Sequence, residues 1–288
     1  MLIEEYRGHL PVRRMCELMN VSRSAYYNFK NKDWPNKDLK DLALKEEIEK
    51  VALFHSGYGS RRITYELRKR GKLINHKKVL RLMRELRLTK KKKHRKPNEN
   101  LTHNLPVYPN LIKDFLPSDI NQLWVADITY IRLRYGFCFL SAILDAFSRR
   151  VVGWALRDNL SAELALSALR MALIRRVIGP RLIHHSDQGV QYASKEYVNL
   201  LKSHGILISM STKGCPQENA MAESFISTIK KEEVYLSEYD NITEALNCMG
   251  HFIEDLYNRK RLHSSIGYLS PVEFEDRLGN ELYIENVS

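Results

Sequence analysis

The amino-acid sequence predicts an α/β domain that follows two all-α modules of the helix-turn-helix type. From about residue 121 onward, segments rich in β-branched and aromatic residues alternate with helical segments, as in layered α/β folds. Residues 1–96 instead carry only helical patterns separated by short turns. We therefore divide the 288-residue chain into modules at 1–35 and 36–96, a linker at 97–118 and the α/β domain with C-terminal helices at 119–280.

The first module has the pattern of a helix-turn-helix. Pro11 suits the first turn of a helix, and apolar residues then follow at helical spacing, namely Val12, Met15, Cys16 and Met19. After a short turn, Ser22 can cap a second helix. Arg23 then lies early on that helix, where a major-groove reader places its base contacts. A plain helical hairpin is the alternative to DNA binding here.

The second module is predicted to contain three helices and a basic tail. The helices are expected at 39–54, 61–70 and 76–86, and the apolar positions of the first are Leu42, Ala43, Ile48, Val51 and Ala52. Gly71 suits the C-terminal end of the second helix, and Asn75 suits the N-cap of the third. Residues 90–96 form a lysine-rich run that we interpret as a phosphate-binding arm.

Positive charge is concentrated in this second module. The whole chain has a formal net charge of +12, whereas residues 61–96 hold seventeen Lys or Arg and two Glu, a net charge of +15. Such a block repels itself unless a polyanion neutralises it, so double-stranded DNA is the expected partner, and a solvated basic face is the alternative. The side chains expected to bind DNA are Arg23, Arg61, Arg62, Lys77, Lys78, Lys91, Lys92, Lys93 and Lys230.

The α/β domain is predicted to contain five strands and four helices before its C-terminal end. The strands are expected at 123–133, 137–145, 149–156, 181–185 and 206–210. The helices are expected at 161–177 and 194–204, with Ser161 and Ser194 as N-caps, and at 219–236 and 243–257.

Three acidic residues of this domain are candidates for catalysis. Asp127 lies mid-strand among apolar residues, where an ionised carboxylate is costly unless a cation compensates it. Asp187 follows the fourth strand, at the kind of strand end where α/β proteins gather their sites. Glu223 lies on a later helix. Taken singly, each has an ordinary alternative: a solvent-facing strand aspartate, a turn aspartate and a solvated helix glutamate.

Taken together, the three carboxylates predict a metal-dependent phosphodiester site. Hard oxygen ligands from three elements suit Mg²⁺ or Mn²⁺, and two such ions can activate an attacking oxygen and stabilise a leaving oxygen. We expect Asp127, Asp187 and Glu223 to be both catalytic and metal-binding. Lys230 lies about two turns after Glu223 on the same helix face. It could hold a DNA phosphate, and a surface lysine is the alternative.

Several neighbouring residues are expected to be structural. For Asp145 we favour a turn role over that of a fourth ligand. His184 and His185 are expected to pack against the sheet or contact DNA, because no second ligand pair has the spacing of a zinc site. The four cysteines are far apart in the sequence and are expected to be free thiols. With neither a long apolar run nor a secretory signal, we expect a cytoplasmic, nucleoid-associated protein that does not enter a membrane.

Several motifs also have a specific order and spacing. They are Trp124-Val125-Ala126-Asp127-Ile128-Thr129-Tyr130, Asp145-Ala146-Phe147-Ser148-Arg149, His185-Ser186-Asp187-Gln188-Gly189-Val190-Gln191-Tyr192, Asn219-Ala220-Met221-Ala222-Glu223-Ser224, and Tyr257-Asn258 with Arg261, His263, Gly267, Tyr268 and Pro271. Upstream stands Tyr58-Gly59-Ser60-Arg61-Arg62-Ile63. In these motifs nearly the whole chain resembles the second-frame products of two-reading-frame bacterial insertion-sequence transposases, which are relatives of retroviral integrases.

This resemblance implies an RNase H-like fold with a mixed five-stranded sheet flanked by helices. It implies Mg²⁺-dependent DNA cleavage and strand joining, with the acidic triad at Asp127, Asp187 and Glu223. Glu218 stands where the family often has Asp, and Cys215 where it often has Asn, and neither change removes a triad member. The family is commonly made as a fusion to an upstream frame, and strand joining brings two ends together, so that a fused upstream product and a homo-oligomer are expected.

The predicted function is therefore that of a transposase that binds transposon-end DNA, cleaves it and transfers the strand to target DNA. One alternative is a DNA-binding regulator with an inactive integrase-like fold, which the intact acids at all three positions disfavour. The other is a nuclease that only cuts, which the two helical modules for duplex DNA disfavour.

Overall fold

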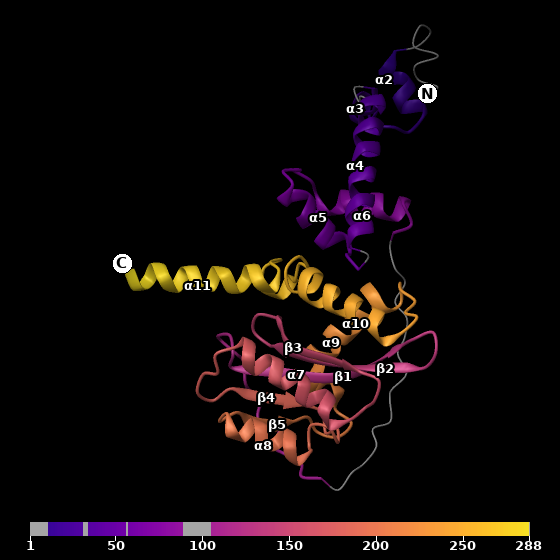
Figure 1. Cartoon of the computed structure of the whole chain (residues 1–288). Helices are drawn as coiled ribbons and strands as arrows, with labels where there is room; N and C mark the ends of the chain where they lie inside the picture. Colours follow the sequence, from indigo (N-terminus) through magenta and orange to yellow (C-terminus); the bar gives the residue numbers. More distant parts are fainter. Residues whose placement is uncertain (1–10, 31–33, 56, 89–104, 288) are drawn as a thin grey trace.

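The computed structural model describes residues 11–30, 34–55, 57–88 and 105–287 (Figure 1). The lysine-rich run at 90–96, with its expected DNA contacts Lys91, Lys92 and Lys93, lies outside the described residues. In the described part, helices α2 to α6 precede the strands, and a long sheet-containing domain follows.

The first helical pair has the predicted helix-turn-helix form. Helix α2 spans Val12–Leu18 with Pro11 at its N-cap, and α3 spans Arg23–Lys30. The hydroxyl of Ser22 accepts a hydrogen bond of 3.1 Å from the backbone N–H of Ala25, as an N-capping serine does. A small core formed by Met15, Cys16 and Tyr26 joins the two helices.

The second helical module consists of α4 (Trp34–Phe54), α5 (Ser60–Lys69) and α6 (His76–Glu85). Helix α4 begins five residues before the predicted start at 39, since Pro35 is tolerated in a first helical turn. The predicted Asn75 cap is confirmed by a 2.9 Å bond from the N–H of Lys77. The apolar core of the module includes Ile48, Val51, Ile63, Leu67, Val79 and Leu82.

The prediction that Leu42 faces this core is wrong, because its side chain is 56% exposed. The neighbouring Asp41 is buried instead, in ion pairs with Lys78 at 2.7 Å and with Arg81 at 2.5 Å. The helix therefore turns a carboxylate toward α6 at this level, where two cations compensate its desolvation.

In the described part of the chain, five strands form one mixed sheet in the order β3-β2-β1-β4-β5. They are β1 (Leu123–Arg132), β2 (Phe137–Asp145), β3 (Val151–Arg157), β4 (Ile183–Ser186) and β5 (Leu207–Met210). The β1–β2 and β2–β3 pairs are antiparallel, whereas β1–β4 and β4–β5 are parallel. This is the mixed five-stranded sheet that the resemblance implied.

Helices cover both faces of the sheet (Figure 1). Helices α7 (Ala162–Arg175) and α8 (Lys195–Ser203) pack on the face that carries Trp124 and Ala126. Helices α9 (Ala220–Ile229) and α10 (Ile242–His251) pack on the opposite face, which carries Leu123 and Val125. Because side chains alternate along a strand, Asp127 belongs to the α9 face.

Two predicted helices end in π-helical turns. The helix expected at 219–236 opens as the 3₁₀ turn η1 (Pro216–Asn219), continues as α9 and ends as η2 (Lys230–Val234). The helix expected at 243–257 ends as η3 (Phe252–Tyr257). In both, buried residues stand five apart, as do Phe252 and Tyr257, and a wider turn keeps such a pair on one face. Ser194 caps α8 as predicted, whereas within the described residues the Ser161 side chain makes no capping bond.

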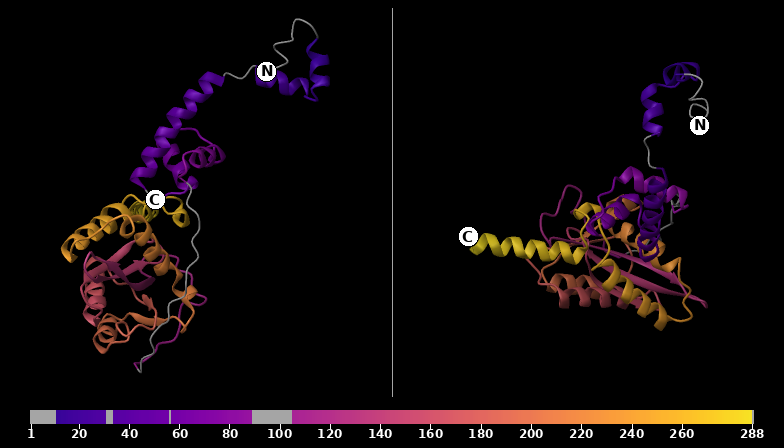
Figure 2. Two further views of the ribbon diagram at one scale, coloured as in Figure 1. Left: turned by 90° about the vertical axis from the view of Figure 1, so that its right-hand side faces the viewer. Right: turned by 90° about the horizontal axis from the view of Figure 1, so that it is seen from above.

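The α4–α6 module lies against the C-terminal segment of the α/β domain, between η3 and α11 (Pro271–Val287) (Figure 2). The hydroxyl of Tyr58 accepts a 2.7 Å hydrogen bond from the backbone N–H of Leu262, and the Leu262 side chain joins the apolar core of the module. Lys69 forms a 2.8 Å ion pair with Glu273. The last short 3₁₀ turn, η4 (Ser264–Ile266), lies in the same segment.

Candidate active site

The strand register brings two of the three candidate acids together. In the parallel β1–β4 pair, Val125 stands opposite His185. Two residues farther along both chains are Asp127 and Asp187, so the two aspartates lie level with each other just beyond the end of β4. The two aspartates are sixty positions apart in the sequence, and the pairing of β1 with β4 makes them neighbours.

The turn after β4 holds Asp187 in place. Its Oδ1 accepts a 3.0 Å hydrogen bond from the backbone N–H of Gly189. A Cβ atom at position 189 would lie only 2.9 Å from that same oxygen. Glycine is therefore needed here because the carboxylate approaches the backbone closely, and its φ angle is not the reason.

Asn219 fixes the start of α9, which carries Glu223, against β1. Its side-chain amide donates a 2.9 Å hydrogen bond to the backbone carbonyl of Ala126, the residue before Asp127. Glu223 lies in the first turn of α9, one turn beyond this anchor. The sequence alone indicates no role for Asn219, although this residue stands in the motif that also holds Glu223.

The pKa of Asp127 is affected by the charges of the other two acids. Burial, followed by the charge of Asp187 and a smaller effect of Glu223, raises the pKa of Asp127 to about 7. The N–H of Ile128 donates a 2.8 Å hydrogen bond to the carboxylate, and Lys230 also favours its ionised form, but neither outweighs burial and repulsion. The carboxylates thus form an acidic cluster whose negative charge is only partly compensated.

Lys230 lies at the end of α9, on the same side as the acids. Its Nζ stands 4.4 Å from the centre of the Tyr130 ring on β1, within cation–π distance. It also lines a groove of about 1110 Å³ with Tyr130, Arg132 and Tyr235. The charge of Lys230 also acts on Asp127, since it favours the ionised form of that carboxyl.

The described residues contain no group of three or more His, Cys, Asp or Glu side chains arranged as a metal site. The donor set nevertheless suits a hard divalent cation, because Asp127 and Asp187 lie level on adjacent strands and, besides burial, their mutual repulsion and a smaller effect of Glu223 raise the pKa of Asp127. A cation drawn between them would relieve that repulsion.

The neighbouring histidines and Asp145 are structural. His184 bonds to the hydroxyl of Tyr197 at 2.9 Å, and His185 bonds to that of Ser209 at 2.8 Å. Burial lowers the pKa of His184 to about 3 and that of His185 to about 4, so both pack in the sheet as neutral side chains. Asp145 accepts bonds from the backbone N–H groups of residues 121, 147 and 148, which is the turn role predicted for it.

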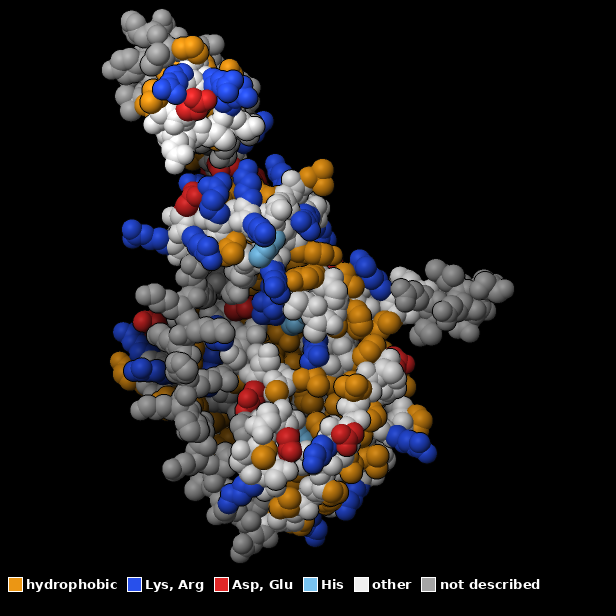
Figure 3. Space-filling view, turned by 180° about the vertical axis from the view of Figure 1, so that it is seen from behind, with side chains coloured by type: hydrophobic (Ala, Val, Ile, Leu, Met, Phe, Trp, Pro, Cys, Tyr) orange, Lys and Arg blue, Asp and Glu red, His pale blue; other side chains and the backbone are white. Residues whose placement is uncertain are grey.

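The candidate DNA contacts fall into two groups. Arg23, Arg61 and Lys77 are exposed on the helical modules, and Lys and Arg side chains gather over this part of the surface (Figure 3). Lys78 is instead engaged with Asp41, and Arg62 is half-buried against the α/β domain. The structure therefore brings Arg62 together with the core and not with the other basic residues.

Three comparisons place the chain among known proteins. Residues 117–216 and 204–271 match models described as "Integrase core domain", and residues 39–96 match a model described as "HTH-like domain". The Shigella sonnei protein "Insertion element IS600 uncharacterized 31 kDa protein" is 39% identical over 267 residues, covering 91% of this chain and 98% of that protein. "Transposase InsF for insertion sequence IS3A" of Escherichia coli (strain K12) is 35% identical over 280 residues, covering 96% and 97%.

Solved structures of retroviral integrases are more distant. The catalytic core domain of BIV integrase is 20% identical, with a TM-score of 0.43, covering 57% of this chain and 99% of that chain. The HTLV-2 integrase catalytic core domain in complex with magnesium is 16% identical, with a TM-score of 0.41, covering 54% and 95%.

An integrase core joined to an HTH-like domain defines a DNA-binding polynucleotidyl transferase. More particularly, the chain belongs to the family of insertion-sequence transposases that includes InsF, and it is a DDE transposase. The transposase prediction is thereby confirmed. Within the described residues, no helix combines the length and apolar character needed to cross a membrane.

Proposed function

We propose that Asp127, Asp187 and Glu223 are the catalytic carboxylates of this transposase and that they hold Mg²⁺ or Mn²⁺, as two ions. The observation that carries the proposal is the parallel register of β1 and β4, which sets Asp127 level with Asp187. Burial and the charges of the other two acids raise the pKa of Asp127, in agreement with this placement. Ionised carboxylates that are buried close together are costly for folding, and binding of cations offsets that cost. Perturbed carboxylates of this kind gather at functional sites.

The chain's own residues supply the geometry of the reaction. Asp127 and Asp187 present oxygens from adjacent strand positions, and Glu223 faces them from α9, which Asn219 anchors to β1. Divalent ions, when bound, activate the attacking oxygen and stabilise the leaving oxygen of a phosphodiester. Lys230, whose Nζ stands 4.4 Å from the centre of the Tyr130 ring, then holds a phosphate of the DNA strand beside the carboxylates.

DNA recognition is assigned to the two helical modules, residues 1–35 and 36–96, joined by the linker 97–118 to the catalytic domain 119–280. Arg23, Arg61 and Lys77 are the exposed contacts that we propose to bind transposon ends. Lys91, Lys92 and Lys93, which follow α6 in the sequence, are proposed to add phosphate contacts. Since strand joining needs two ends, we propose a homo-oligomer that works as a fusion with the upstream-frame product and acts at the nucleoid in the cytoplasm.

The direct test uses the purified chain, or its upstream-frame fusion, with a duplex that carries the element's terminal repeat. With Mg²⁺ or Mn²⁺, the parent should yield nicked and strand-joined DNA, whereas Asp187→Asn and Glu223→Gln should yield neither. Glu196→Gln, an exposed change on α8, is the matched control and should leave both products. Equal product from the Asp187→Asn variant would show that the carboxylates are wrongly assigned. Nicks without joined product would indicate a nuclease that only cuts.

A further inference from the structure

A small polar pocket lies where the second helical module meets the catalytic domain. Its volume is about 160 Å³, and it is lined from α5, from the β2–β3 turn, from α9 and from the segment 257–265. Three arginines from three separate parts of the chain line it, namely Arg62, Arg149 and Arg261. The catalytic residues play no part in this pocket, because Ser224 and Thr228 line it from a different face of α9 than the one bearing Glu223 and Lys230.

The positive charge in this pocket is only partly compensated. Arg261 forms two 2.9 Å bonds to the carboxylate of Glu232. The Nε of Arg149 is buried, and within the described residues it has no hydrogen-bond partner. Burial and the nearby Arg261 lower the pKa of Arg62, and the charge of Glu232 opposes this shift without cancelling it. A buried guanidinium N–H without an acceptor is unfavourable and points to a missing anionic partner.

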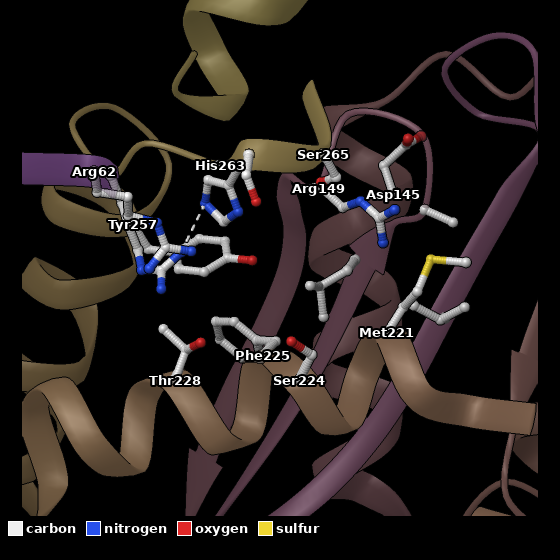
Figure 4. A pocket seen from close by; sticks show the side chains of 15 residues that line it. Arg62, Asp145, Arg149, Met221, Ser224, Phe225, Thr228, Tyr257, His263 and Ser265 are labelled. Carbon is white, nitrogen blue, oxygen red and sulfur yellow. Dashed lines mark hydrogen bonds between the residues drawn. The ribbon is translucent and has the colours of Figure 1, made fainter. Parts of the chain in front are cut away.

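The other lining groups suit an oxyanion. Burial and the three arginines lower the pKa of His263 to about 2, so that it is neutral and adds no charge. Asp145 also lines the pocket, but backbone N–H groups already occupy its oxygens. Figure 4 shows Ser224 and Thr228 directed from α9 toward the side chains of Arg149 and Tyr257. Their hydroxyls add hydrogen-bond donors on that side.

We propose that this pocket binds one phosphate group, held by Arg62 and Arg149 and bordered by Arg261. The planar fork of a guanidinium matches the geometry of phosphate oxygens, and the small volume admits a group of that size. Because Arg62 comes from α5 and Arg149 from the catalytic domain, a bound phosphate links the DNA-binding module to the catalytic domain. The phosphate comes either from free phosphate or from the backbone of bound DNA.

The first arm of the test uses inorganic phosphate without divalent metal. Thermal unfolding of the full chain is followed as phosphate replaces chloride at constant ionic strength. The melting temperature of the parent should rise with phosphate, and this rise should be lost in Arg149→Met and in Arg62→Met. Arg170→Met, an exposed change on α7, is the control and should keep the rise. Comparing each variant with itself in chloride separates phosphate binding from any loss of folding stability.

The second arm measures binding to duplex DNA over a series of salt concentrations, again without divalent metal. If the occupant is a backbone phosphate, Arg62→Met and Arg149→Met should each reduce the slope of log K against log salt by about one, the value for one phosphate contact. If the two variants lose only the rise in melting temperature with phosphate, the occupant is free phosphate. If they also show a smaller slope of log K against log salt, the occupant is a phosphate of the DNA backbone. If neither response differs between the parent and the two variants, the proposal is overturned. Both arms are independent of strand transfer, so failure of the catalytic assignment would not affect them.

Discussion

Burial of Asp127 should make the metal-free protein lose stability as pH rises. A carboxyl pKa of about 7 in the folded protein exceeds its ordinary value of 3.8. Below pH 4 the Asp127 carboxyl is protonated in both the folded and the unfolded state, so its titration does not change the free energy of unfolding. Between pH 4 and 7 the unfolded chain ionises while the folded protein stays protonated, so the free energy of unfolding falls by up to about 4 kcal/mol, at about 1.4 kcal/mol per pH unit. Above pH 7 this contribution is constant.

The substitution Asp127→Asn tests this reasoning, because asparagine has a similar shape and no charge. In urea unfolding with a chelator present, the variant should match the parent near pH 4 and exceed its free energy of unfolding by up to about 4 kcal/mol at pH 8. Two of the three tryptophans, Trp124 and Trp154, lie in strands of the sheet and report its unfolding by fluorescence. Adding Mg²⁺ at pH 8 should stabilise the parent and leave the variant unchanged.

The control for this experiment is Asp114→Asn, which removes one carboxylate from an exposed position in the linker. Taking the difference between variant and parent at each pH cancels the titration of all other groups. If Asp127→Asn gains no more stability at pH 8 than at pH 4, the carboxylates do not repel one another as the structure implies. Gained stability without a Mg²⁺ response in the parent would instead refute the metal assignment.

Three further substitutions test how the site is supported. Asn219→Ala removes the bond that anchors α9 and should lower kcat in strand joining by about 10- to 100-fold, as small displacements of catalytic groups do. Tyr58→Phe leaves the buried N–H of Leu262 unpaired and should cost about 1–3 kcal/mol in urea unfolding. Gly153→Ala would place a methyl group 2.2 Å from the carbonyl oxygen of Ala168 on α7, so the melting temperature should fall by the equivalent of about 1–3 kcal/mol or more.

Each of these substitutions has a matched control. Asn199→Ala and Tyr27→Phe change exposed side chains and should have no effect. Gly250→Ala adds a methyl group at ordinary contact distance, 3.5 Å from Trp154, and should be tolerated. An unchanged kcat in Asn219→Ala, or a melting temperature of Gly153→Ala equal to that of Gly250→Ala, would contradict the corresponding contact.

The sequence predicted the strands well because these segments are rich in β-branched and aromatic residues. It also marked Asp127 as a candidate, since a charged residue inside an apolar strand is conspicuous. The single expected site of three acids rested on metal chemistry and on the resemblance, because the parallel register in which Val125 stands opposite His185 cannot be derived from the sequence pattern. The π-turns were missed for a related reason: the pattern was interpreted with a helical period, and a spacing of five between buried residues interrupts that period only once in each helix.

From the sequence, the basic residues of the second module were expected to form one DNA-binding surface. In the structure, two of them contact other parts of the protein instead. Lys78 pairs with Asp41, and Arg62 turns toward the catalytic domain. Both arrangements depend on partners far away in the sequence or on another helix. A count of charges gives the sign of the surface potential, but it cannot separate a lysine used in the fold from one available to DNA.

The residues of the shared motifs therefore divide into two kinds with opposite effects on stability. Asn258 hydrogen-bonds both the N–H and the carbonyl of Val151, and Asn219 bonds to β1, so both stabilise the fold on which the site is built. Asp127 does the reverse, because its ionised form is unfavourable in the folded protein until a cation binds. Loss of activity alone cannot separate these kinds, since replacing a residue of either kind lowers activity. The free energy of unfolding, measured above pH 7 without metal, can separate them. It should rise in Asp127→Asn and fall in Asn258→Ala.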